Sequence, residues 1–330
     1  MSPLVQGPAE VRSRLPVSRL SITMEATEDC LLPSFTGSLL RGMFGHSLRR
    51  VFCMTGRREC TECPAINSCL YNSIFQEERN VPVFPGGRFP PRPYIINAPQ
   101  GGTFRKGDSL EWGFTVCGPF ASHIPSFILA FQIMAQKGLG ARRNPFKLTR
   151  VRDSLNGTLI YSANADHDDQ KEENAFEREK LNWQIKELKE ILKAPENIPE
   201  RAEILFRFAS PARFTAGGKH LYRLNGPDFL TAVRRRYELM HLHYGELDRE
   251  DIKTDESFRL IALEENTVRR GRYSNRQGRA LEMRGLLGLY RLEGADRALQ
   301  NLLRAMTVLH AGKSAGFGMG RLEILEMRPV

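Results

Sequence analysis

The residue with the clearest potential for chemistry is His46, in a segment predicted to be a helix from about Ser34 to Phe52. Apolar side chains recur there at helical spacing and predict a core-facing stripe of Leu40, Phe44, Leu48 and Val51. The opposite side carries Gly42, Gly45, His46, Arg49 and Arg50. An imidazole beside the Arg49 guanidinium suits phosphodiester chemistry, because one group moves protons and the other stabilises charge. From these residues alone, a solvated histidine without function is the commoner case.

Three glycines in this helix support a surface on which something approaches the backbone. A glycine inside a helix costs about 1 kcal/mol relative to alanine. Gly37, Gly42 and Gly45 all fall in the predicted helix. We therefore expect one side of the helix to be kept clear for a ligand.

The end of the chain carries a second candidate, the glycine-rich segment from Gly312 to Gly320. It follows a predicted helix (Ala295 to His310) and leads into a strand, whereas phosphate-cradling loops follow a strand and open a helix. A P-loop would also need glycine at Thr307. We reject the ATPase interpretation and predict a side-chain-poor strip for an extended polyanion, bordered by Lys313 and Arg321.

A predicted strand hairpin from about Arg259 to Tyr290 is rich in arginine, which pairs phosphates and stacks on bases. Its basic side chains between Asn266 and Arg284 outnumber the one acid, Glu282. We predict that nucleic acid contacts this hairpin. The complete set of predicted RNA-binding residues is Arg50, Arg142, Arg143, Arg269, Arg270, Arg272, Arg276, Arg279, Gly316, Phe317, Gly318 and Arg321.

Four cysteines fall close together, and Cys60 and Cys63 have the spacing of a zinc knuckle. The group is Cys53, Cys60, Cys63 and Cys69. In a reducing compartment such a group favours a metal over disulfides. Zinc is favoured over an iron–sulfur cluster, and thiols that bind nothing are the third interpretation. Four sulfur ligands would make a closed, structural site with no catalytic part.

The composition is that of a globular protein with a basic balance. The 330 residues carry a formal net charge of +10, which favours nucleic acid or another polyanion as partner. We see no apolar run long enough to span a membrane and no signal-peptide core, so we expect a cytoplasmic protein.

The predicted elements repeat. Each half reads β-α-β-β-α-β, with a glycine-rich, basic turn after its second helix. That order is the ferredoxin-like plan, so we predict an α+β fold of tandem ferredoxin-like (RRM-like) domains with a cysteine-rich and an acidic helical insertion. The expected boundaries are 1–160, 161–200 and 201–330, with the cysteine cluster at 53–69.

The acidic insertion lies between the halves. From Ala163 to Glu200 there are 11 acidic and 6 basic side chains, a net charge of −5. The run Glu177 to Lys193 predicts a helix with opposite charges at helical spacing. We expect this segment to stay away from nucleic acid.

Three motifs together resemble the RAMP-superfamily endoribonucleases that process CRISPR precursor transcripts. They are Leu40-Arg41-Gly42-Met43-Phe44-Gly45-His46 followed by the cysteine cluster and Cys69-Leu70-Tyr71, then Gly138-Leu139-Gly140, and finally the terminal glycine-rich segment. The likeness covers nearly the whole chain except the acidic insertion.

The resemblance implies an enzyme that binds CRISPR repeat RNA and cuts it once without a metal cofactor, leaving a 2′,3′-cyclic phosphate and a free 5′-hydroxyl. It implies that His46 acts as general base or acid. Arg49 and Lys313 are the candidates for stabilising charge on the phosphate. We expect a monomer or homodimer, with a CRISPR effector complex as a further partner. Two other functions stay open: a non-catalytic RNA-binding subunit of such a complex, and a metal-stabilised DNA-binding regulator.

Overall fold

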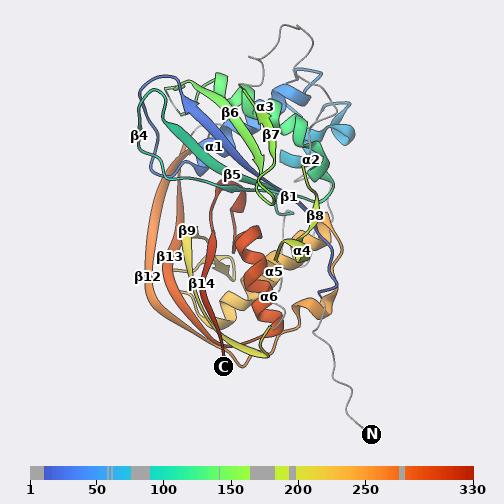
Figure 1. Cartoon of the computed structure of the whole chain (residues 1–330), viewed down its shortest axis with the longest axis vertical. Coiled ribbons are helices and arrows are strands. Elements are labelled where there is room, and N and C mark those ends of the chain that lie inside the picture. The colour runs from blue at the N-terminus through green and yellow to red at the C-terminus, as the bar shows by residue number, and fades with distance from the viewer. Residues whose placement is uncertain are drawn as a thin grey trace. The chain divides into compact units, whose positions relative to one another are not determined.

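The computed structural model describes residues 11–57, 59–60, 62–75, 90–140, 142–163, 183–192, 198–274 and 279–330 (Figure 1). The chain divides into two compact units. The N-terminal unit comprises Val17–Ile185 and Gly316–Gly318, and the C-terminal unit comprises Met1–Pro16, Lys186–Ala315 and Met319–Val330. Each unit is described by itself.

The N-terminal unit is built on an antiparallel sheet with the strand order β3-β5-β1-β6-β7. Its strands are β1 (Pro16–Ala26), β3 (Tyr94–Asn97), β5 (Ser109–Cys117), β6 (Phe146–Asp153) and β7 (Leu159–Ser162). Two helices, α1 (Gly37–Phe52) and α3 (Ile124–Gln136), pack against each other on this sheet (Figure 1). The short elements are β2 (Cys30–Leu31), η1 (Ile66–Ser68), α2 (Leu70–Phe75), β4 (Thr103–Phe104) and η2 (Gly118–His123).

Aromatic packing fixes the orientation of α1. The ring of Phe44 is fully buried and lies 5.0 Å, centroid to centroid, from Phe114 on β5. Phe127 and Phe131 of α3 approach the same ring at 5.9 and 5.6 Å. Such ring pairs contribute about 0.5–1.5 kcal/mol each beyond the area they bury. Because this side of α1 is anchored in the core, the side that carries His46 faces outward.

The C-terminal unit is built on a second antiparallel sheet, with the strand order β12-β13-β9-β14. Its strands are β9 (Arg201–Ala212), β12 (Arg259–Ser274), β13 (Arg279–Asp296) and β14 (Leu322–Pro329). Helices α5 (Gly226–Tyr244) and α6 (Arg297–Leu309) pack against each other on this sheet (Figure 1). The remaining short elements of this unit are β8 (Lys186–Glu187), α4 (Leu188–Leu192), β10 (Thr215–Ala216), β11 (Lys219–His220) and η3 (Arg249–Ile252). The short helix η4 (Ala315–Phe317) falls mostly in the part Gly316–Gly318 of the N-terminal unit.

Side-chain hydrogen bonds define the starts of α5 and α6 and the end of α6. The Asn225 side chain accepts a hydrogen bond from the backbone of Asp228 at the start of α5. Asp296 does the same for Leu299 at the start of α6. At the end of α6, the Arg236 guanidinium donates to the carbonyl of Leu309 at 3.1 and 3.0 Å. These contacts satisfy backbone groups that a helix leaves unpaired, and the last one fixes the point where the glycine-rich segment begins.

The α+β class predicted from the sequence is confirmed, and both sheets are antiparallel. In each unit the main elements follow the order strand, helix, strand, strand, helix, strand. Corresponding strands also occupy the same positions, since β3, β5, β1 and β6 match β12, β13, β9 and β14. Among the described residues, no helix has both the length and the apolar character needed to cross a bilayer.

Residues 164–182 and 193–197 of the acidic segment lie outside the described residues. Of the helix predicted from Glu177 to Lys193, the structure describes residues 183–192, and only α4 (Leu188–Leu192) is helical. Residues 183–187 end in the short strand β8, so the helix prediction was wrong for them. The proposed boundaries at residues 160 and 200 therefore stay predictions.

Candidate nucleic-acid interface

His46 lies on the outer side of α1, as predicted, and its side chain is exposed. Leu40, Phe44 and Leu48 on the other side are fully buried. Gly42 is four residues before His46, so the two positions are neighbours on the helix surface. Within the part of the chain that the structure describes, a Cβ placed on Gly42 meets nothing within 4 Å. An open patch of helix backbone therefore adjoins the imidazole.

The other two glycines of α1, Gly37 and Gly45, pack against the protein itself. The prediction that they keep a surface clear for a ligand was therefore wrong. A Cβ on Gly37 would lie 1.9 Å from the carbonyl oxygen of Phe317. A Cβ on Gly45 would lie 2.5 Å from the ring of Phe75, and Gly45 is buried. Both glycines make room for the protein's own chain. Only Gly42 matches the prediction of a cleared surface.

The turn Gly316–Gly318 packs on the N-terminal unit, so the predicted open strip also needs correction. A Cβ on Gly318 would lie 2.8 Å from the Cβ of Ala98, and one on Gly316 would lie 3.3 Å from the ring of Tyr94. Both glycines are buried. Their small size serves internal packing, and this geometry gives no support to their predicted contact with RNA.

Phe317, between these glycines, has a half-buried side chain that holds a cation. The Arg41 guanidinium lies 4.6 Å from the centroid of the Phe317 ring and 5.0 Å from that of Phe75. Cation–π contacts of this kind stabilise by about 0.5–2 kcal/mol. Arg41 and Phe317 thus fix the turn on the first part of α1.

Arg49 is directed toward the cysteine segment. It donates a hydrogen bond to the carbonyl of Arg57, and its guanidinium lies 5.9 Å from the centroid of the Tyr71 ring. Burial lowers the pKa of Arg49, but the Cys53 hydrogen bond and nearby thiols outweigh burial and raise it. The structure thus gives Arg49 a role in holding this segment, and its predicted role at a phosphate stays a prediction. Arg50 is exposed on the same helix.

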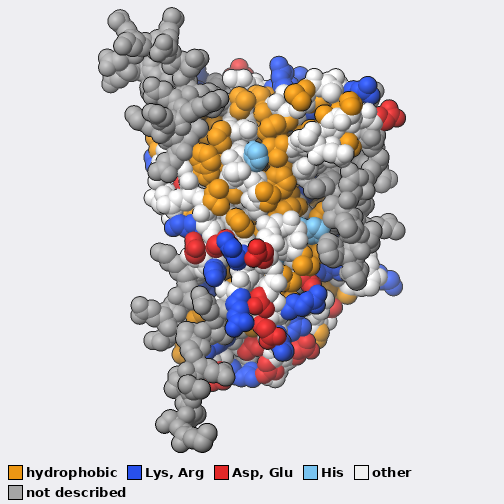
Figure 2. Space-filling view, turned by 90° about the vertical axis from the view of Figure 1, so that its right-hand side faces the viewer, with side chains coloured by type: hydrophobic (Ala, Val, Ile, Leu, Met, Phe, Trp, Pro, Cys, Tyr) orange, Lys and Arg blue, Asp and Glu red, His pale blue; other side chains and the backbone are white. Residues whose placement is uncertain are grey.

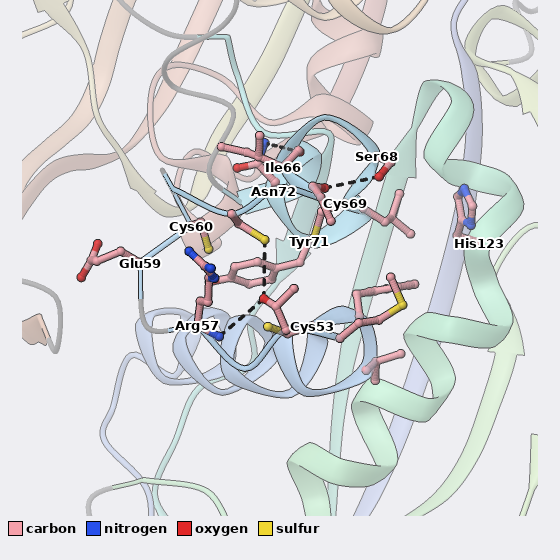
Figure 3. Close-up of a pocket in the computed structure, with 17 residues that line it drawn as sticks. Cys53, Arg57, Glu59, Cys60, Ile66, Ser68, Cys69, Tyr71, Asn72 and His123 are labelled. Atoms are coloured by element: carbon pink, nitrogen blue, oxygen red, sulfur yellow. Dashed lines mark hydrogen bonds between the residues drawn. The ribbon is translucent and has the colours of Figure 1, made fainter.

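The four clustered cysteines line one pocket of about 320 Å³, together with Tyr71 and His123 (Figure 3). The amide of Cys63 donates to the carbonyl of Cys60 at 3.1 Å, which closes a tight turn between the two. Burial raises the pKa of Cys60. Hydrogen bonds from the Gly56 backbone, Arg49 and Thr55 overcome the opposing effect of burial and lower the pKa of Cys53.

The zinc prediction receives no support from this arrangement. Among the described residues, no three His, Cys, Asp or Glu side chains are grouped so that they hold a metal ion. The four thiols share one pocket, but no grouping of them gives the structural zinc prediction support.

The C-terminal unit gathers five basic side chains, which we call the cationic cluster: Arg213, His220, Arg235, Lys313 and Arg284. A two-residue turn places His220, since Gly217 and Gly218 connect β10 to β11 with φ of +55° and +80°. Both values lie in the left-handed region, which glycine adopts without cost. The backbone of Lys313 pairs with that of Arg213, with an N–H to carbonyl distance of 2.9 Å.

Mutual repulsion and burial act on the pKa values of this cluster. Burial first, then Arg213, Lys313 and Arg284, lower the pKa of His220. Burial, then Arg235 and Arg213, lower the pKa of Lys313. Burial also lowers the pKa of Arg213. The cluster is therefore a site that disfavours further positive charge and favours an anion.

The three consecutive arginines of α5, Arg234 to Arg236, point to different partners. Arg234 forms an ion pair with Glu256 at 3.1 Å, and Arg236 contacts Leu309. Of the three, Arg235 is the one whose charge lowers the pKa of Lys313. Sequence reasoning missed Arg213 and His220 as members of the cluster, although the turn Gly217-Gly218 between strand-forming residues was a readable signal.

The arginine hairpin forms as predicted, from β12 and β13. Arg269 lies directly opposite Arg284, and Glu282 forms ion pairs with both at 3.3 and 2.9 Å. Part of the hairpin's charge is thus neutralised internally. Arg270 is half-buried. Arg276 lies outside the described residues, as do the side chains of Arg272 and Arg279.

The remaining arginines that were predicted to bind RNA lie on separate elements of the structure. Arg142 and Arg143 are exposed on a turn between α3 and β6, where Arg143 has a φ of +52°. Arg321 forms an ion pair with Glu323 at 2.8 Å. One face of the molecule shows Lys and Arg side chains interspersed with Asp and Glu (Figure 2). The net charge alone therefore does not locate an interface.

Comparison with known families gives two matches. A family described as an N-terminal domain matches residues 15–174, and the family of the CRISPR-associated endoribonuclease Cas6 matches residues 206–322. An uncharacterized protein of Archaeoglobus fulgidus is 22% identical over 299 residues, which cover 89% of this chain and 92% of that protein.

Solved structures share the fold over nearly the whole chain. A Cas6 product complex is similar with a TM-score of 0.53 and 15% identity, covering 94% of this chain and 99% of the other. Thermus thermophilus Cas6 is similar with a TM-score of 0.52 and 14% identity, covering 96% and 100%. A partial Cas6-RT-Cas1–Cas2 complex gives 0.54 and 10%, covering 97% of this chain and 48% of the other. Residues 206–322 therefore match the Cas6 endoribonuclease family, and the fold of nearly the whole chain is that of solved Cas6 structures.

Proposed function

We propose that this protein is an endoribonuclease that cuts CRISPR repeat RNA to release mature guide RNA. The observation that carries the proposal is an exposed histidine on α1, beside open helix backbone at Gly42, in a chain with a Cas6 domain. An accessible imidazole next to a helix position that carries no side chain allows a ribose and its phosphate to approach within hydrogen-bonding distance.

The proposed reaction is a transesterification. The 2′-oxygen of one ribose attacks the adjacent phosphorus, and the bond from phosphorus to the 5′-oxygen of the next nucleotide breaks. One proton leaves the 2′-hydroxyl and one reaches the departing 5′-oxygen, so the products are a 2′,3′-cyclic phosphate and a 5′-hydroxyl. His46 performs one of these two proton transfers, which typically contributes a factor of about 10² to 10⁴ in rate.

Charge on the phosphate needs a cation close by. Arg50 is exposed and lies four residues after His46 on the same helix, so it is placed to contact the same ligand. Arg49 remains a candidate for this role. The proposal requires no metal cofactor for the cut.

We further propose that each unit is a ferredoxin-like domain. The β-α-β-β-α-β order and the matching strand positions of the two sheets support this assignment. The proposed partner is CRISPR repeat RNA. Association with other CRISPR proteins is a further proposal, supported by the likeness to a solved Cas6-RT-Cas1–Cas2 complex.

The test is incubation of the full chain with labelled repeat RNA in excess chelator. We expect one cut, a cyclic phosphate on the upstream product, and a loss of about 10² to 10⁴ in rate for His46→Ala. His123→Ala, which changes another histidine of the N-terminal unit, is the matched control and keeps its rate. Tight RNA binding without a cut would instead identify a non-catalytic subunit, and a preference for duplex DNA would identify a regulator.

A further inference from the structure

We propose that Arg213, Lys313 and Arg284 form a phosphate-binding site in the C-terminal unit, and that His220 positions Arg213 within it. The ligand is a phosphodiester of a ribose-phosphate strand. This inference deepens the proposed function, because it names a contact that grips the RNA without cutting it.

The backbone brings two of the three cations together. Lys313 follows Gly312, which has a φ of +75°. A Cβ on Gly312 would lie 2.5 Å from the carbonyl oxygen of Arg213, so only glycine lets the segment approach this closely. Ser314 also has a positive φ, of +70°. A non-glycine residue in this region costs about 1 kcal/mol or more, which indicates that the position of Lys313 is imposed by the surrounding structure.

Two of the three cations of this site, Arg213 and Lys313, are not balanced by nearby acids. Within the described part of the chain, neither Arg213 nor Lys313 forms an ion pair. Arg284 pairs with Glu282. The Nε–H of Arg213 is buried and has no acceptor among the described residues. Positive groups this close repel one another, and a bound anion would relieve that repulsion.

His220 is neutral for a chemical reason. The Nη2 of Arg213 lies 3.0 Å from Nε2 of His220. A guanidinium only donates hydrogen bonds, so Nε2 must be the unprotonated acceptor. Protonation of His220 would remove this acceptor and place a second positive charge against Arg213. The imidazole therefore orients the guanidinium without competing for its ligand.

An aromatic ring beside the site favours nucleic acid over an acidic peptide. Tyr222 is 51% exposed, and its hydroxyl accepts a hydrogen bond from Arg284 at 3.1 Å. A base can stack on an exposed ring next to the cations that hold its phosphate, which is how single strands are commonly bound. The site thus offers contacts to both parts of one nucleotide.

The test measures binding of a repeat RNA with 2′-O-methyl groups on every ribose, which no 2′-hydroxyl attack can cut wherever the site falls. An unrelated RNA of equal length is measured in parallel. For Arg213→Gln and Lys313→Gln we expect about tenfold weaker binding of both RNAs. We also expect the slope of log affinity against log salt to become shallower by about 0.7 for each lost contact.

Arg259→Gln is the matched control. Arg259 is an exposed arginine of the same unit, paired with Glu293 at 2.7 Å, and its loss changes the net charge equally. We expect it to leave affinity and salt slope nearly unchanged. The proposal is overturned if Arg213→Gln behaves like Arg259→Gln, or if only the repeat RNA binds more weakly, since a phosphate contact is indifferent to sequence.

The positioning role of His220 is tested by rescue. His220→Gln retains an acceptor for Arg213 and should bind RNA nearly as well as the wild type, whereas His220→Phe should lose about as much as Arg213→Gln. The double variant Arg213→Gln/His220→Phe should lose no more than Arg213→Gln alone. Additive losses, or equal losses for Gln and Phe, would refute the role. Because no step of this test involves cleavage, an inactive protein that binds RNA through these residues would refute only the nuclease.

Discussion

The outer surface of α1 and the cationic cluster each contain a histidine, and each receives part of the segment Gly312–Gly320. On α1 the histidine is exposed, and the nearby Arg41 and Arg49 contact the protein's own rings and carbonyl groups. In the cationic cluster the histidine is half-buried and surrounded by other cations.

These two environments suit different tasks. An exposed imidazole can exchange protons with a ligand, so His46 fits general acid–base chemistry. An imidazole that accepts a hydrogen bond from a guanidinium is committed to that contact, so His220 fits orientation of Arg213. We therefore propose that one unit supplies the chemistry and the other supplies grip on the phosphate backbone.

The sharpest test of this division is a crossover of kinetic effects, and it carries the largest expected change. In single-turnover cleavage at saturating repeat RNA, His46→Ala should lower the rate by about 10² to 10⁴ and leave RNA affinity nearly unchanged. Arg213→Gln should weaken affinity by about tenfold and leave the saturated rate within about threefold.

The division fails if both variants change the same parameter. An Arg213→Gln protein with normal affinity and a large loss of rate would make Arg213 part of the reaction. A His46→Ala protein that binds poorly but cuts at a normal saturated rate would make His46 a binding residue. Thermal unfolding of each variant serves as the control for folding.

The next test concerns Gly37, which packs against Phe317, and Gly312, which packs against Arg213. Each glycine fixes the position of one part of the segment Gly312–Gly320. Gly37→Ala places a methyl group where the Phe317 carbonyl lies, and Gly312→Ala adds a methyl group at positive φ against the Arg213 carbonyl. Each should lower the free energy of unfolding by about 2 kcal/mol or more, measured by urea titration. At protein concentrations where both variants are folded, Gly312→Ala should bind RNA more weakly. Normal RNA binding by Gly312→Ala would show that the position of Lys313 does not matter.

Hydrophobic periodicity was enough to predict the main helices and strands. The stripe of Leu40, Phe44 and Leu48 predicted both the existence of α1 and the side that is buried. The cationic cluster was not predictable in this way, because Arg213 and Lys313 are 100 positions apart and meet only through the packing of the folded unit. Spacing along one element carries no information about such pairs.

The glycines of α1 are a second case in which the sequence alone does not identify the neighbour in the fold. Sequence reasoning correctly identified Gly37, Gly42 and Gly45 as unusual in a helix. It could not determine whether a ligand or the protein's own chain fills the space. The answer depends on Phe317 and Phe75, which approach α1 from elsewhere in the chain. Of the three, only Gly42 has no neighbour at its Cβ position among the described residues.

Gly42→Ala tests whether the substrate uses the open space at Gly42, and its expected effect is smaller than those of the variants above. With nothing within 4 Å of the new methyl group, we expect the free energy of unfolding to rise by up to about 1 kcal/mol, the usual helix preference for alanine. If RNA lies against the backbone beside His46, the same variant should cut repeat RNA more slowly although it is more stable. Faster or unchanged cleavage would show that the substrate approaches His46 from another side.

The smallest expected effect concerns Arg49 and asks whether it belongs to the reaction or to the cysteine segment. Hydrogen bonds from Gly56, Arg49 and Thr55 outweigh burial and hold the pKa of Cys53 below its ordinary value, which favours the reactive thiolate. Arg49→Met removes one of these donors, so the pKa of Cys53 should rise and its alkylation by iodoacetamide at neutral pH should slow by a few-fold. Mass spectrometry of the modified peptides measures this rate, with Cys63 as the internal reference. If Arg49→Met leaves Cys53 alkylation unchanged but abolishes cleavage, Arg49 belongs with His46 in the chemistry, and the α1 surface uses its own arginine on the phosphate.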